Sequence, residues 1–88
     1  MALFTFILEF DGGTYISQFQ GSSPDDAAAK YVDYVVGLKG MSTPSNRRRL
    51  GASLSLERPV AIEGVRKVWC CSASVRGKLA LVNIVATA

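Results

Sequence analysis

Residues 3–26 decide the fold, and they read LFTFILEFDGGTYISQFQGSSPDD. Apolar and polar side chains alternate over residues 3–10, and a looser alternation runs over 14–20; a period of two is expected of β-strands. Asp11-Gly12 between the two runs is a favoured pair for a type I′ turn, because both central positions of that turn need a positive φ. This stretch therefore predicts a β-hairpin.

A helix start follows the hairpin directly. Ser23 is a suitable N-cap, and Pro24 suits the first helical position. Asp25 and Asp26 favour the positive end of the helix dipole. Apolar residues then recur three and four positions apart, which places them on one side of a helix. We expect a helix over residues 24–38 that covers one face of the sheet.

The rest of the chain is divided by residues that break secondary structure. Residues 39–51 have no hydrophobic period, so we expect a long basic loop there. Pro59 limits the following stretch, 60–62, to a short edge piece. Alternating patterns predict three further strands at 52–57, 67–75 and 78–87. The prediction is thus a single α+β domain over residues 1–88. Its antiparallel sheet has four to five strands, in the order ββα and then βββ, with one helix packed on a face.

The apolar faces of the first strand and the helix should form the core. The last strand is apolar on both sides, so we expect it to be central or covered on both faces. A single helix can cover only one face of the sheet, so the other face would remain exposed. We therefore expect a homo-oligomer, most simply a symmetric dimer. The residues expected to be buried are Phe4, Phe6, Leu8, Tyr31, Val35, Leu81 and Val85.

The chain contains no histidine, which removes the commonest general base and the commonest zinc ligand. Cys70 and Cys71 supply two ligands where a structural zinc site needs four, and neighbours on a strand point to opposite faces. One thiol is expected to pack in the core; a disulfide or redox switch, which would need a second chain, is the alternative. We predict no catalytic residue, no metal site and no cofactor, and we expect the protein not to be an enzyme.

Charge is divided unevenly along the chain. Residues 1–38 carry five acidic residues against Lys30 alone, a net charge of −4, whereas residues 39–88 carry nine basic and two acidic residues, a net charge of +7. Together they give the chain its net charge of +3. A basic second half can attract nucleic acid, an acidic protein or the acidic half of the same chain, or it can be plain solvated surface.

Three consecutive arginines are the most prominent polar feature. Guanidinium groups of Arg47, Arg48 and Arg49 can bind phosphate oxygens through forked hydrogen bonds. Arg76 and Lys78 could extend the patch. These five residues are the candidate contacts for an anion or a partner. Three basic residues fall short of the five to eight of a typical basic motif, and solvated surface is the alternative.

No apolar stretch approaches the length of a membrane span, so we expect no membrane association. The start, Met1 to Phe4, has no basic region before an apolar run and no small-residue cleavage site. We therefore expect a cytoplasmic protein.

The runs 6–17 (FILEFDGGTYIS) and 23–29 (SPDDAAA) resemble the opening of HicB-like antitoxin domains. In that family a strand ends in an acidic residue, a glycine turn and an aromatic-rich strand follow, and a helix starts with Thr/Ser-Pro-Glu-Glu-Ala. The likeness covers about the first third of the chain, and the family's third strand before the helix has no counterpart at 20–22. The resemblance implies a toxin-neutralising or regulatory module of α+β type, and it carries over no catalytic residue.

Taken together, these features predict a small non-enzymatic binding or regulatory module that acts on a macromolecular partner. Antitoxin-like protein binding is one form of this function. The alternatives are a weak, sequence-independent nucleic-acid binder that uses the basic loop, and a purely structural homo-oligomeric protein.

Overall fold

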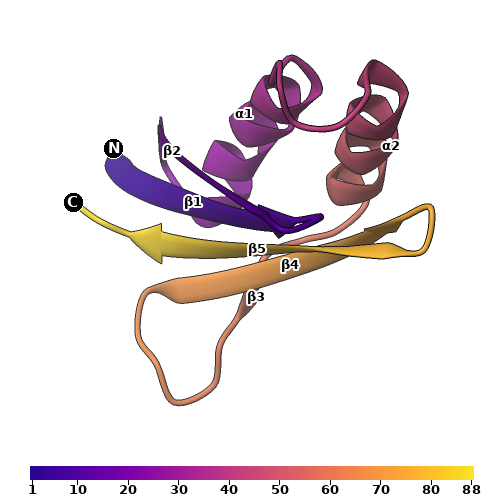
Figure 1. Cartoon of the computed structure of the whole chain (residues 1–88). Helices are drawn as coiled ribbons and strands as arrows, with labels where there is room; N and C mark the ends of the chain where they lie inside the picture. The colour runs from indigo at the N-terminus through magenta and orange to yellow at the C-terminus, as the bar shows by residue number, and fades with distance from the viewer.

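A computed structural model describes residues 1–88 and contains one five-stranded antiparallel sheet with two helices on the same face (Figure 1). The elements are β1 (Ala2–Phe10), β2 (Gly13–Gly21), α1 (Pro24–Val36), α2 (Pro44–Ser55), β3 (Val60–Ala61), β4 (Val68–Val75) and β5 (Lys78–Ala86). The strand order is β2-β1-β5-β4-β3, so the first and last strands of the chain lie side by side. The predicted α+β class with an antiparallel sheet is confirmed.

Both hairpins close through turns of the same geometry. Asp11 and Gly12 have φ angles of 50° and 81°, and Arg76 and Gly77 have 52° and 81°. Positive φ at both central positions is typical of a type I′ turn, whose twist matches that of the flanking strands. The β1–β5 pairing joins the two hairpins into one sheet.

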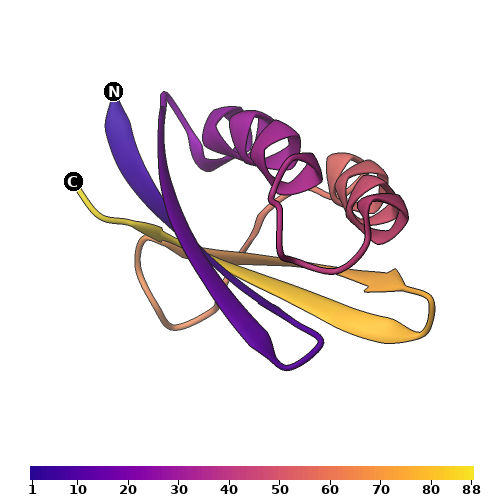
Figure 2. The same ribbon diagram turned by 45° about the horizontal axis from the view of Figure 1, so that its top comes forward.

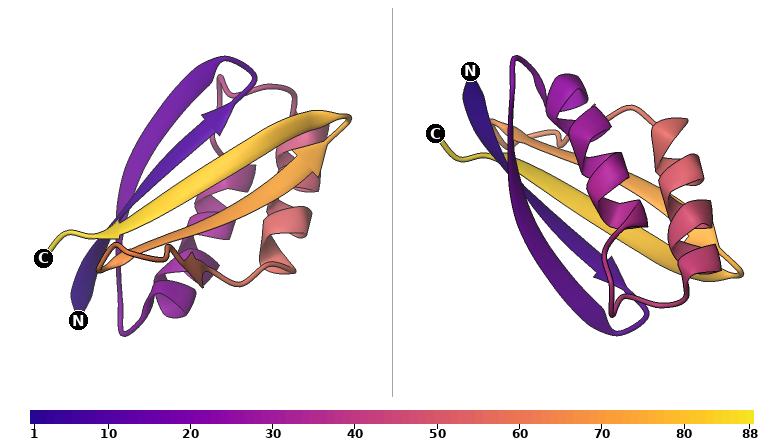
Figure 3. Two further views of the ribbon diagram at one scale, coloured as in Figure 1. Left: turned by 90° about the horizontal axis from the view of Figure 1, so that it is seen from below. Right: turned by 90° about the horizontal axis from the view of Figure 1, so that it is seen from above.

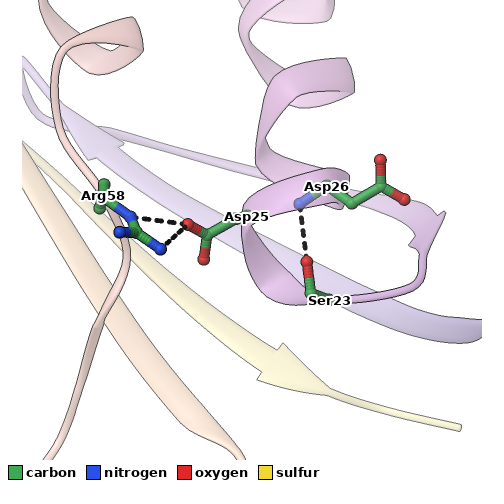
Figure 4. A network of polar contacts seen from close by, with 4 residues as sticks. All are labelled: Ser23, Asp25, Asp26 and Arg58. Atoms are coloured by element: carbon green, nitrogen blue, oxygen red, sulfur yellow. Dashed lines mark hydrogen bonds and ion pairs between the residues drawn. The ribbon is translucent and has the colours of Figure 1, made fainter.

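Local hydrogen bonds fix the start of α1. The Ser23 hydroxyl accepts from the backbone N–H of Asp26 at 3.1 Å (Figure 4), and the Asp26 carboxylate accepts from the N–H of Ser22 at 2.9 Å. The first bond is the N-cap interaction expected of Ser23, and the second ties the residue before the cap to the first turn of the helix. The helix ends at Val36 because Gly37 is its C-cap, which is slightly earlier than the predicted residue 38.

Aromatic rings hold α1 on the sheet. The ring of Tyr31 stacks on that of Phe6 with centroids 4.4 Å apart and an interplanar angle of 13°. Phe19 of β2 meets Phe6 edge-on at 5.8 Å and Tyr34 at 5.4 Å. Such pairs contribute about 0.5–1.5 kcal/mol each beyond the area they bury. Five predicted core residues, Phe4, Phe6, Leu8, Tyr31 and Val35, are buried.

The expected loop over 39–51 and the expected strand over 52–57 are both wrong. Thr43 caps a second helix by accepting from the N–H of Asn46 at 3.1 Å, and α2 runs through most of this region. Its buried Leu50 and Leu54 are one turn apart and face the core. The region lacks a clear period because Leu50 and Leu54 are the only large apolar side chains that α2 buries. Leu54 and Leu56 also imitate the alternation of a strand, although Leu56 is 84% exposed.

The core assignment on β5 is also wrong. Leu81 and Val85 point away from the helices and are only half-buried. Ala80, Val82 and Ile84 are the buried residues of β5. The register decides this, because Ile84 lies opposite Phe6, whose side chain faces α1.

We expect Gly21→Ala to destabilise the protein by about 1–3 kcal/mol, because a Cβ at Gly21 would lie 2.7 Å from the backbone N of Ala27, which a side-chain rotation cannot relieve. Gly37→Ala is the matched control, since the nearest atom to its added Cβ is 3.8 Å away. That change should leave stability unchanged or raise it by up to about 1 kcal/mol. Urea unfolding followed by circular dichroism measures both, and equal stability of the two variants would contradict the close packing at Gly21.

Candidate functional site

Arg47, the first of the three arginines, has a structural position. Its Nε donates to the backbone O of Val36, the last residue of α1, at 3.1 Å. Its Nη1 donates to the backbone O of Ser42 at 3.1 Å. The side chain thus ties the end of α1 to the start of α2, and it satisfies the carbonyl of Val36, one of those that a helix C-terminus leaves without partners.

Arg76 and Lys78 also have partners within the chain. Arg76 Nε donates to Asn46 Oδ1 at 2.8 Å, which links the β4–β5 turn to the first turn of α2. Lys78 Nζ lies 2.8 Å from Asp11 Oδ1, which links the two hairpin turns. Both pairs are exposed, so each contributes little to stability.

Arg48 and Arg49 are the members of the candidate set that remain available. Both are exposed on α2, and neither guanidinium group makes a hydrogen bond or an ion pair in the structure. Arg47, Arg76 and Lys78 are engaged within the chain, whereas Arg48 and Arg49 present free guanidinium groups to solvent.

A shallow groove of about 400 Å³, which no sequence pattern indicates, lies between α1 and the segment that follows α2. Its floor is apolar, and its rim carries the carboxylates of Asp25, Asp33 and Glu57. Arg58 closes one side, with Nε and Nη2 each 2.9 Å from Asp25 Oδ2 (Figure 4). The one hydroxyl of the lining, Ser55, donates to the backbone O of Ala52 in its own helix and is not paired with a base. This arrangement offers no nucleophile–base pair.

The largest uncovered feature is the sheet face away from the helices, here called the open sheet face (Figure 3, left). The strand registers place only one charged side chain on it, that of Glu9, although the chain has ten basic and seven acidic residues. The loop 62–67 between β3 and β4 drops below the sheet on this side (Figures 1 and 2). The apolar residues of the open sheet face are Leu3, Ile7, Ile16, Val60, Val68, Leu79, Leu81 and Val85.

The two cysteines lie on opposite sides of the sheet, as strand alternation predicted. Cys71 packs against the core, whereas Cys70 pairs with Asn83 and lies on the open sheet face. Burial, with smaller contributions from Cys70 and Glu57, raises the pKa of the Cys71 thiol to about 11. Both thiols are free, and no group of three or more metal-ligating side chains is present in the structure.

The comparisons with known proteins add no assignment. No protein-family model, no curated protein and no solved structure matches this chain. The likeness to HicB-like antitoxin domains therefore stays a hypothesis from the sequence. Neither helix is long and apolar enough to cross a membrane.

The raised pKa of Cys71 predicts a loss of stability at high pH. The unfolded chain releases this proton near pH 9.0, whereas the folded chain keeps it up to about pH 11. The free energy of unfolding should therefore fall as pH rises through this interval. Cys71→Ala should flatten that part of the slope relative to the parent protein.

Cys70→Ala is the matched control, and it should keep most of the slope because burial of Cys71 is the main cause of the shift. Denaturant titrations at several pH values measure the three slopes. The same slope in the parent and in Cys71→Ala would contradict this assignment.

Proposed function

We propose that the protein is a non-enzymatic binding module whose open sheet face is the contact surface for a macromolecular partner. The observation that carries this proposal is the near absence of charge on that face in a chain with 17 charged residues, seven of them acidic and ten basic. The centres of protein interfaces are depleted of charged residues, and exposed apolar patches mark interaction sites. Three residues of the face, Ile16, Val60 and Leu79, are 65%, 63% and 66% exposed.

The size of the open sheet face favours a protein partner. Its four long strands have eight or nine residues each. With strands about 4.8 Å apart and a rise of about 3.3 Å per residue, they span roughly 600 Å². A standard protein interface buries about 800 Å² on each partner. The loop 62–67 at the border of the face supplies charged residues for a polar rim. A toxin-neutralising module, as the sequence resemblance implies, is one form that this function could take.

A variant that places a charge on the open sheet face tests the proposal. The tagged wild-type chain is used to capture its partner from extracts of its source cells. We expect the Leu81→Lys variant no longer to capture that partner, because the partner would have to bury the ammonium group. Leu56→Lys is the control, since Leu56 is 84% exposed and lies outside the sheet. Quantitative mass spectrometry compares the captured proteins, and circular dichroism confirms that both variants fold. Equal capture by all three chains would contradict the proposal.

Nucleic-acid binding is the second candidate, and the free guanidinium groups of Arg48 and Arg49 favour it. Two phosphate contacts give a slope of log affinity against log salt of only about −1.8 on duplex DNA. We expect duplex oligonucleotides to bind weakly at low salt and not measurably at physiological salt, as followed by fluorescence anisotropy. Tight binding that the double change of Arg48 and Arg49 to Ala abolishes would establish nucleic-acid binding in place of the open sheet face.

A further inference from the structure

Strand β2 is an unprotected edge of the sheet. It has nine residues, and it contains no charged residue and no proline. Its register with β1 is continuous from Gly13 to Gly21, without a bulge. Natural proteins guard long edge strands with charges, prolines, bulges or covering elements, because a free edge can pair with another chain. The opposite edge consists of β3, which has two residues and follows Pro59, and of the stretch 71–75 of β4 that β3 does not reach; neither is as long as β2.

The backbone groups that face outward from β2 can be assigned. Leu3 N donates to Ala88 O at 2.6 Å, and Leu3 O accepts from Thr87 N at 2.7 Å, so the polar groups of Leu3 point away from β2. Pairs in an antiparallel ladder alternate. The opposite residue, Gln20, therefore points its own N–H and C=O out of the sheet. The same alternation turns the backbone groups of Thr14, Ile16 and Gln18 outward.

One end of this edge is already occupied. Lys30 of α1 reaches over the strand and donates from Nζ to Gln20 O at 2.8 Å. No such bond is made to the outward groups of Thr14, Ile16 or Gln18. In both views of Figure 3, the half of β2 next to the β1–β2 turn is a free border of the molecule. The free part of the edge is thus centred on Ile16.

We propose that β2 pairs antiparallel with β2 of a second copy, about a two-fold axis at Ile16. In this register Ile16 lies opposite its own copy and Thr14 lies opposite Gln18, which leaves the Gln20 carbonyl to Lys30. A second copy fits this edge because an antiparallel strand is its own partner under a two-fold axis, and an uncharged strand brings no like charges together. The side chain of Ile16, 65% exposed in the single chain, gains a cross-strand neighbour.

The pairing would join two sheets into one. The two-fold axis of an antiparallel pair is perpendicular to the sheet, so both open sheet faces would lie on the same side. The loop 62–67 projects from that side and stands in the way of stacking two such faces flat against each other (Figure 1). Edge pairing thus uses a surface different from the face proposed for the partner, and either proposal can fail alone.

Sedimentation equilibrium on the full chain over a micromolar to millimolar range tests the inference. We expect the wild-type mass to rise from 9.4 kDa to twice that value with concentration. Ile16→Lys should stay a monomer, because two ammonium groups would meet at the axis. Leu79→Lys is the matched control: Leu79 is 66% exposed on the same face but lies on β5, two strands from the edge, and this variant should dimerise like the wild type.

Ile16→Pro separates backbone pairing from side-chain contact. It removes an N–H that points away from β1, so the edge strand should tolerate it and the folded chain should be a monomer. Circular dichroism verifies the fold of each variant. A wild-type chain that remains a monomer throughout overturns the inference. So does a dimer that survives Ile16→Lys or Ile16→Pro, or one that Leu79→Lys dissociates.

Discussion

The structure depends on the packing of both helices against one face of a single sheet. The stack of Tyr31 on Phe6, with Phe19 and Tyr34 around it, holds α1 over β1 and β2. Gly51 lets α2 approach α1 closely, since an added Cβ there would lie 2.5 Å from Val36 Cγ2. No helix or strand of residues 1–88 covers the other face. The uncovered face and the free edge follow from this one-sided arrangement.

Local signals made the N-terminal half predictable. A type I′ turn at Asp11-Gly12 and a capped helix start at Ser23 depend on residues that are neighbours in sequence. The second helix is hard to predict because only Leu50 and Leu54 mark its buried side, and because its N-cap, Thr43, lies among residues that are also typical of a loop. Tertiary packing, and not the propensity of its polar surface residues, explains why α2 is a helix.

The open sheet face and the free edge of β2 depend on the order of the strands in the sheet, which no local sequence pattern reveals. Both sides of β5 are apolar, so alternation could not decide whether Leu81 or Val82 is buried; the pairing with β1 decides it. Likewise, the exposed edge of β2 exists because the C-terminal strand inserts beside β1. The arginine cluster was found from the sequence, but the capping role of Arg47 depends on where α1 ends. The charge pattern of the sequence alone does not show which basic side chains already bind groups of the same chain.

The helices cover one face of the sheet and leave the other open. Attenuation of methyl NMR signals by a soluble gadolinium chelate tests this arrangement directly, because neighbours on β5 point to opposite faces. In dilute solution, the signals of Leu81 and Val85 should be strongly attenuated, and those of Val82 and Ile84, which are fully buried, should be retained. Equal protection of both sets would mean that the open sheet face is covered, and it would contradict this account of the protein.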